Sequence, residues 1–197
     1  MLVYTNGKVN LAALRCCAAN SLEQWCELLG WHQTEENNIS TELPTYSIVR
    51  DPLPRFAHGF TEKMIKMWTG NNQFNKPTEY FVMESAVARL SDSALIELIS
   101  SILKEPWRIN WTDDQHIRLQ SDWLGIFKYL TLIKIDELNT LPDLFGVQEP
   151  IPKHPATHNN FINHLIDLSA EVCSLDTGVL EFIEPDNTFL DQYDYYP

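Results

Sequence analysis

The segment around Arg50 places a basic side chain where an anion can be held. Arg50 follows the β-rich run Thr45–Val49, and Pro52, two residues further on, is a favoured first residue of a helix. A guanidinium binds a phosphate through two parallel hydrogen bonds, and the N–H groups of a helix N-terminus attract the same anion. The segment therefore predicts an anion site. The alternative is an ordinary helix start, with Asp51 as its cap and with Arg50 and Arg55 in solvent.

Lys8 is a second candidate cation. It lies in a turn sequence after Leu2–Thr5, which is predicted to be a short buried strand. Residues 11–29 then carry apolar side chains at spacings of three and four, and Gly30 follows, so this stretch is predicted to be a helix. A lysine between a strand and a helix is again a candidate to bind an anion, and a solvated turn lysine is the alternative.

The elements that position these residues alternate along the chain. A helix is predicted over 51–68, and the clearest strand is 129–135. Alternating strands and helices predict an α/β sandwich around a mostly parallel sheet, in which ligands bind beyond the carboxyl ends of the strands. The loops 6–10 and 50–54 are predicted to lie there. The remaining elements are predicted to be helices at about 79–90, 93–104, 159–172 and 178–193 and an ordered loop at 141–155.

Composition limits the partners. The 197 residues are 44% hydrophobic, enough for one domain over 1–197 with a sizeable core. The 27 acidic and 14 basic residues give a net charge of −13, which argues against nucleic acid, an anionic membrane or a heavily sulfated polysaccharide as the main partner. The four cysteines have no metal-ligand spacing and are predicted to be free thiols. With no signal peptide and no apolar run that spans a bilayer, we expect a complete, cytoplasmic protein.

The segment that begins at Arg50 resembles sulfotransferases of the carbohydrate and heparan type. These enzymes carry Arg-Asp-Pro-x-x-Arg-x-x-Ser-x-Tyr after a β-strand, and in them the first Arg and the Ser bind the 3′-phosphate of the donor 3′-phosphoadenosine-5′-phosphosulfate (PAPS). The resemblance gives Arg50 this role directly. His58 stands in the place of the Ser, where a ring N–H can also donate to the phosphate. The matching residues are Arg50, Asp51, Pro52 and Arg55, with Phe60 in the aromatic place.

A second family segment, Pro-Lys-x-Gly-x-Thr-Ser, follows the first strand and holds the 5′-phosphosulfate. Lys8 matches its lysine, 42 residues before Arg50, and by resemblance would stabilise charge on the leaving phosphate. Ala12 and Ala13 stand where the family has hydroxyl side chains, so backbone N–H groups would hold the phosphate. The residues that the resemblance assigns to the donor's 5′ end are Gly7, Lys8, Val9, Asn10, Leu11, Ala12 and Ala13.

Two later stretches extend the resemblance along the chain. Asp114, His116 and Gln120 match an Asp-x-His-x-x-x-Gln stretch that lies midway through family members. Asp186 and Tyr193 lie in a stretch that resembles the terminal helix, which carries an Asp and then a Leu-Tyr. The resemblance implies a P-loop-like three-layer sandwich, with a mostly parallel central sheet flanked by helices, over a single domain.

The implied reaction transfers the sulfuryl group of PAPS to a hydroxyl of a small molecule or a glycan, without a metal. It needs a base for the acceptor's proton. His32 is the first candidate, because family bases often lie between the two phosphate segments, and His116 and His58 follow. Glu35 and Glu36 are further alternatives in a polar loop.

Two other functions stay open. The missing hydroxyls at Ala12, Ala13 and His58 fit a degenerate member that keeps the fold and binds a nucleotide or a partner without catalysis. A nucleotide kinase of related fold would use the same loop for ATP, but the sequence lacks G-x-x-x-x-G-K-[S/T].

Overall fold

A computed structural model of the chain describes residues 1–35, 38–69, 87–104, 114–153, 160–193 and 195. These residues form two compact units, which we call the sheet unit and the helical unit. The prediction of one sulfotransferase-like domain over 1–197 stays a prediction. The sheet unit comprises Met1–Pro52, Arg118–Pro155 and Glu184–Pro197, and the helical unit comprises Leu53–Ile117 and Ala156–Ile183.

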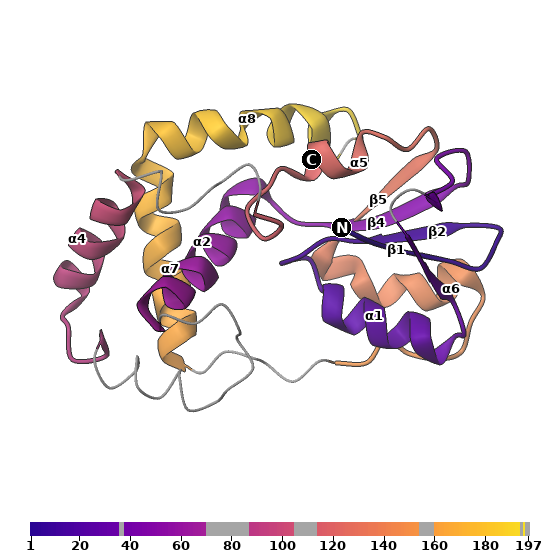
Figure 1. The fold of residues 1–197 in the computed structure, drawn as a ribbon, viewed down its shortest axis with the longest axis horizontal. Helices are drawn as coiled ribbons and strands as arrows, with labels where there is room; N and C mark the ends of the chain where they lie inside the picture. Colours follow the sequence, from indigo (N-terminus) through magenta and orange to yellow (C-terminus); the bar gives the residue numbers. More distant parts are fainter. Residues whose placement is uncertain (36–37, 70–86, 105–113, 154–159, 194, 196–197) are drawn as a thin grey trace. The chain divides into compact units, whose positions relative to one another are not determined.

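The sheet unit is built around a mixed sheet whose described strands lie in the order β3-β1-β2-β4-β5 (Figure 1). β1 pairs antiparallel with β2 and with β3, whereas β2–β4 and β4–β5 are parallel. The α/β class is therefore confirmed, but two of these four pairings are antiparallel where the sequence predicts a mostly parallel sheet. The strands are β1 (Leu2–Thr5), β2 (Asn10–Ala13), β3 (His32–Thr34), β4 (Thr45–Val49) and β5 (Leu130–Lys134).

β1 and β2 form a hairpin, so the helix predicted to begin at residue 11 is wrong in its first part. Leu11 pairs with Tyr4 on one side and with Tyr46 on the other, and it is fully buried. A central strand covered on both faces is apolar at successive positions, which a short stretch of sequence does not distinguish from the apolar face of a helix. The first helix, α1 (Ala19–Leu28), begins eight residues after Leu11.

One face of the sheet is covered by α1 and by α6 (Leu141–Phe145) (Figure 1). The Phe145 ring lies 6.1 Å from the Trp25 ring of α1 and 4.9 Å from the Tyr46 ring of β4, measured between centroids. Trp25 is fully buried, and its indole N–H donates to the Glu149 carbonyl at 2.7 Å. Residues 141–145 therefore form a helix that packs a partly buried aromatic ring against the sheet, where the sequence predicts a loop.

The sheet unit also contains the last part of a helix shared with the helical unit. This helix, α8 (Thr177–Asp191), passes from one unit to the other after Ile183. Leu190 and Tyr195 belong to the core of the sheet unit and are buried there. The unit further contains α5 (Gln120–Leu124) and the 3-10 helix η3 (Ile135–Thr140).

The helical unit packs α2, α4, α7 and the first part of α8 around a second core. Phe60, Ile99 and Leu165 are fully buried in it. The Thr61 hydroxyl donates to the Ser169 hydroxyl at 2.8 Å, which joins α2 to α7. Helices predicted at 51–68, 93–104, 159–172 and 178–193 are confirmed, and residues 79–86 of the one predicted at 79–90 lie outside the described residues. The bounds are α2 (Pro52–Thr69), α4 (Asp92–Leu103) and α7 (Asn160–Leu175).

No helix among the described residues combines the length and the apolar character needed to cross a membrane. The four cysteines are all described and all free, as predicted. Cys17, Cys26 and Cys173 are buried and Cys16 is half-buried. Burial, with the Glu27 carboxylate nearby, raises the pKa of Cys26 to about 12, so this thiol stays neutral.

Candidate functional site

The segment predicted to hold the donor's 5′ end is a β-hairpin. Gly7 and Lys8 lie in its turn, where Gly7 has a φ of 82° and the Asn6 side chain accepts hydrogen bonds from the N–H groups of Lys8 and Val9 at 3.0 and 3.1 Å. The residues that follow belong to β2, whose backbone pairs with both β1 and β4. N–H groups of a sheet ladder are committed to that ladder, so they do not form the expected helix start. This correction applies to Asn10, Leu11, Ala12 and Ala13.

Lys8 and Arg50 lie at opposite ends of the sheet. Asn10, just after the hairpin turn, pairs with Thr45, the first residue of β4, whereas Arg50 follows the last residue of that strand. A strand of this length separates its two ends by about 17 Å, at about 3.3 Å for each residue. Lys8 is exposed at its end. The structure therefore does not bring Lys8 to Arg50.

His32, the first candidate base, lies at the same end of the sheet as Lys8. It begins β3 and pairs with Thr5, the residue that leads into the hairpin turn, and its side chain is exposed. The length of the sheet therefore separates His32 from Arg50, as it also separates Lys8 from Arg50. Of the two glutamates considered with it, Glu35 directly follows β3 and Glu36 lies outside the described residues.

A different loop occupies the place expected for an anion site. Residues 14–18 connect the end of β2 to the start of α1. Paired residues of β2 and β4 are 35 positions apart, as in Ala12 and Ser47 (47 − 12), and the same offset relates Arg15 to Arg50. The two arginines therefore leave neighbouring parallel strands at one edge of the sheet. Each is half-buried, and each precedes a helix.

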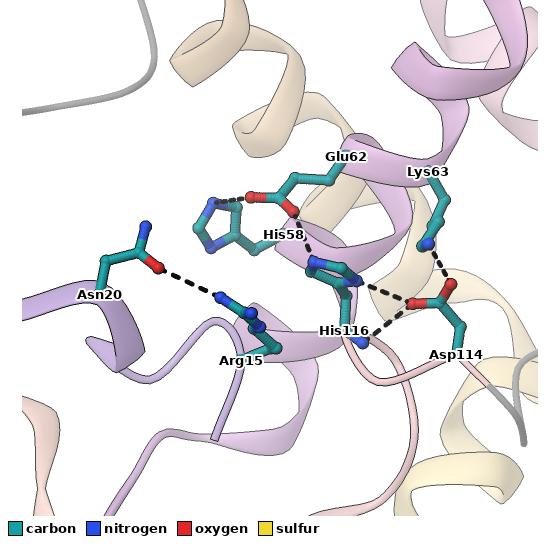
Figure 2. Close-up of polar contacts among 7 residues, drawn as sticks. All are labelled: Arg15, Asn20, His58, Glu62, Lys63, Asp114 and His116. Carbon is teal, nitrogen blue, oxygen red and sulfur yellow. Dashed lines mark hydrogen bonds and ion pairs between the residues drawn. The ribbon is translucent and has the colours of Figure 1, made fainter. Parts of the chain in front are cut away.

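The backbone of this loop has an uncommon conformation. Cys16 and Ala18 have φ values of 63° and 59° and are the only non-glycine residues of the described chain with positive φ. Each costs about 1–2 kcal/mol, and left-handed residues that alternate with others turn neighbouring N–H groups towards one concavity, which binds anions. Ala18, at the N-cap of α1, has no side-chain acceptor, and the first turn holds no acid. Arg15 Nη1 donates to Asn20 Oδ1 at 3.1 Å (Figure 2).

Arg50 is held by the side chain of Gln120, the first residue of α5. Gln120 Nε2 donates to the Arg50 carbonyl at 2.8 Å, and the Arg50 N–H donates to Gln120 Oε1 at 3.1 Å. The same Oε1 lies 3.7 Å from the Cys17 thiol, which belongs to the loop before α1. Gln120 is fully buried. One amide therefore contacts both arginine-bearing loops.

Asp186 of α8 holds Gln120 in turn. Its carboxylate accepts hydrogen bonds from the N–H groups of Gln120 and Ser121 at 2.9 and 2.8 Å, and so caps the N-terminus of α5. Asp186 is 2% exposed. Three segments that carry the family resemblance, around Arg50, Gln120 and Asp186, thus meet in one hydrogen-bonded cluster. We call Arg15, Cys17, Arg50, Gln120 and Asp186 the sheet-edge cluster.

The helical unit contains a second polar cluster, the histidine network (Figure 2). Lys63 contacts the Asp114 carboxylate, and Asp114 Oδ1 lies 3.0 Å from Nδ1 of His116 and 2.9 Å from its backbone nitrogen. Nε2 of the same ring lies 3.4 Å from Glu62 Oε2, and Glu62 Oε1 lies 3.7 Å from Nε2 of His58. The structure therefore brings His58 and His116 into one network.

Asp114 carries the charge that orients this network. Burial alone would raise its pKa, but hydrogen bonds from His116 and Lys63 outweigh that effect and hold the pKa of Asp114 well below its usual value. Gly59 of α2 lets the segment of His116 approach the helix, because a Cβ at Gly59 would lie 2.4 Å from the His116 carbonyl oxygen. The network thus depends on a close backbone contact as well as on charge.

Arg55 and Phe60, which match the family segment, lie inside the helical unit. Arg55 is 2% exposed and its Nη1 donates to the Ile117 carbonyl at 3.4 Å, so the alternative of a solvated Arg55 is wrong. Phe60 is fully buried and stacks on Phe56 at a centroid distance of 6.2 Å. Both side chains therefore position the segment from within the core.

Arg15 and its loop were not among the residues that the sequence indicated. The short apolar run before Arg15 fits a buried strand as well as one side of a helix, so the sequence offers this loop as an alternative without deciding it. Within the residues that the structure describes, no group of three or more His, Cys, Asp or Glu side chains is arranged to hold a metal ion.

Comparison of the chain with protein-family models, with curated proteins and with solved structures found no match. The assignment of a function therefore depends on the sheet-edge cluster, the histidine network and the resemblance of individual segments.

Proposed function

We propose that this chain binds PAPS at the sheet-edge cluster and transfers its sulfuryl group to a hydroxyl of a small molecule or a glycan. One observation carries the proposal: Arg15 and Arg50 follow neighbouring parallel strands at the same edge of the sheet, before α1 and α2. Carboxyl ends of parallel strands are where α/β proteins bind ligands. In this proposal β2, β4 and β5 form the P-loop-like part of a mixed sheet.

The two arginines take different ends of the donor. Arg50 binds the 3′-phosphate, as the resemblance of its segment implies. Arg15, with the left-handed loop at Cys16 and Ala18, takes the 5′-phosphosulfate in place of Lys8. In a protein with a net charge of −13, a nucleotide with anionic groups at both its 3′ and its 5′ positions needs placed cations of this kind rather than a broad positive surface.

The reaction follows from this arrangement. The acceptor oxygen attacks sulfur, the bond between sulfur and the bridging phosphate oxygen breaks, and that oxygen keeps the electron pair. The products are a sulfate ester and 3′,5′-adenosine bisphosphate. Arg15 would stabilise the charge that develops on the leaving phosphate. The acceptor's proton goes to a base.

Calorimetric titration with 3′,5′-adenosine bisphosphate tests the donor site. We expect wild type to bind, and Arg15→Ala and Arg50→Ala each to weaken binding roughly 10- to 100-fold, because each removes charge-assisted hydrogen bonds. Lys8→Ala is the matched control, since it removes a cation of the same unit at the other end of the sheet. The affinity of this variant for the bisphosphate should stay within about twofold of the wild-type affinity. No binding by wild type at millimolar ligand, or equal losses in all three variants, would contradict the proposal.

A second candidate function is donor binding without transfer. The observation that favours it is the composition of the loop 14–18, which contains no hydroxyl side chain for the phosphosulfate. Transfer of ³⁵S from labelled PAPS to a panel of hydroxyl acceptors separates the two functions. Binding of the bisphosphate with no labelled product would favour the degenerate form, and preferential binding of ATP would favour the kinase alternative.

A further inference from the structure

The contact between Gln120 and Arg50 has the pattern of a strand pairing. The primary amide both donates to the Arg50 carbonyl, at 2.8 Å, and accepts from the Arg50 N–H, at 3.1 Å, as a neighbouring peptide group would. Arg50 is the first residue after β4, whose last residue, Val49, pairs with Lys134 of β5. The side chain of Gln120 thus binds the backbone directly beyond the strand and fixes the direction in which the Arg50 side chain leaves it.

Only an amide serves both hydrogen bonds at this position. A carboxylate can accept from the Arg50 N–H but has no hydrogen to donate to the carbonyl, and a thioether is only a weak acceptor and cannot donate. Because Gln120 is fully buried, water does not replace a bond that is lost there. Asp186 fixes the Gln120 backbone from the other side, so the amide is held in one orientation.

The same amide reaches the second loop. Gln120 Oε1 accepts from the Cys17 thiol at 3.7 Å, between the two left-handed residues Cys16 and Ala18. The loop that carries Arg15 and the residue that carries the other guanidinium are therefore both bonded to a single buried group.

We propose that Gln120 is a positioning residue that joins the two arginine loops into one site selective for nucleotides with phosphates at both the 3′ and the 5′ positions. This inference rests on the proposed function, because it takes Arg15 and Arg50 as the groups that bind the donor. A ligand with one phosphate uses only one of the two loops, so its affinity does not depend on how the two loops are aligned. A ligand with two phosphates needs both loops at a fixed spacing, and so its affinity depends on Gln120.

Binding of three nucleotides by wild type and by Gln120→Met tests the inference. The probes are 3′,5′-adenosine bisphosphate, adenosine 5′-monophosphate and adenosine 3′-monophosphate, each titrated calorimetrically. We expect Gln120→Met to weaken binding of the bisphosphate about tenfold and of the 5′-monophosphate by less than about twofold, a coupling within the usual range between linked sites. A merely structural role would lower the two affinities by the same factor and would overturn the inference.

A pair of milder variants keeps the test decisive if Gln120→Met does not fold. Cys17→Ser replaces the thiol by a hydroxyl that can also donate to Gln120, whereas Cys17→Ala removes the donor. We expect Cys17→Ala to reduce the preference for the bisphosphate about threefold and Cys17→Ser to restore it. Equal preferences in wild type, Cys17→Ala and Cys17→Ser would overturn the role of Gln120 in joining the loops.

The outcomes separate this inference from the proposed function. If wild type binds none of the three nucleotides, the proposed function fails and the inference fails with it. If wild type prefers the bisphosphate but neither Gln120→Met nor Cys17→Ala changes the preference, the donor site stands and only the inference fails.

Discussion

The sheet-edge cluster and the histidine network hold parts of this chain together in different ways. In the sheet unit, Gln120 and Asp186 are buried, and they bind peptide N–H and C=O groups more than other side chains. In the helical unit, the network consists of partly buried ionisable side chains that bind one another, with exposures between 13% and 22%. Buried groups bound to the backbone fix its geometry, whereas partly exposed ion pairs are weakened by water and depend on pH. The first arrangement therefore fixes the backbone just beyond the strands, whereas the second should respond to salt and pH.

Removal of Asp186 should have the largest effect on stability. Asp186→Ala leaves the N–H groups of Gln120 and Ser121 without their acceptor, and we expect the free energy of unfolding to fall by about 3 kcal/mol, because each buried donor left unsatisfied costs about 1–3 kcal/mol. Urea denaturation measures the change. Asp186→Asn is the control, since its amide oxygen retains one acceptor and should cost about half as much. Equal stability of wild type and Asp186→Ala would show that the cap on α5 does not support the sheet-edge cluster.

A methyl group at Gly59 tests how closely the histidine network depends on the backbone. In Gly59→Ala the new Cβ would lie 2.4 Å from the His116 carbonyl oxygen, so the segment of His116 must move away from α2. We expect a loss of about 2 kcal/mol in the free energy of unfolding, typical of an overpacked contact. Gly125→Ala is a less crowded comparison, because its nearest contact is 2.9 Å. A larger loss in Gly125→Ala than in Gly59→Ala would contradict the importance of this approach.

The lowered pKa of Asp114 predicts a pH dependence of stability for the histidine network. The pKa of Asp114 is lowered in the folded state, so its carboxylate stabilises the fold above the unfolded-state value of about 3.9, and this stabilisation is lost as the pH falls below it. We expect Asp114→Asn to be less stable than wild type by about 1 kcal/mol at pH 6, with the difference shrinking below about pH 4. Chemical denaturation at pH 6, 5 and 3.5 measures it. A difference that stays constant with pH would rule out the charge as its cause.

The two clusters also differ in how far the sequence reveals them. The strand, the helix after it and the position of Arg50 between them were predictable, because their signals lie close together in the sequence. These signals are the β-rich run Thr45–Val49, Pro52 and the apolar spacing that follows. The strand that contains Leu11 was not predictable, because a strand buried on both faces and one side of a helix share the same short apolar pattern. Because of this single ambiguity, the predicted helix start and the candidate loop at Lys8 lie at the opposite end of the sheet from Arg50.

The contacts between distant segments were harder to predict from the sequence than the helices and strands themselves. Gln120 meets Arg50 across 70 positions and Asp186 across 66. Resemblance of separate segments named all three residues, but spacing along the chain does not show that they form hydrogen bonds with one another. In the helical unit, His58 and Glu62 are one helical turn apart and their contact is predictable, whereas the contact of Glu62 with His116 depends on tertiary structure.

A surface ion pair provides the smallest expected effect and the reference for both clusters. Lys128 Nζ lies 2.9 Å from Glu42 Oε2, a shorter separation than the one between His116 and Glu62, but the two side chains are 57% and 67% exposed. Pairs of this kind contribute about 0–1 kcal/mol, because water and salt screen them. We therefore expect Glu42→Gln to change the free energy of unfolding by less than about 0.5 kcal/mol in urea denaturation. If Glu42→Gln were as destabilising as Asp114→Asn, short distance rather than burial would decide the strength of these contacts, and the distinction between the two clusters would no longer rest on their exposure.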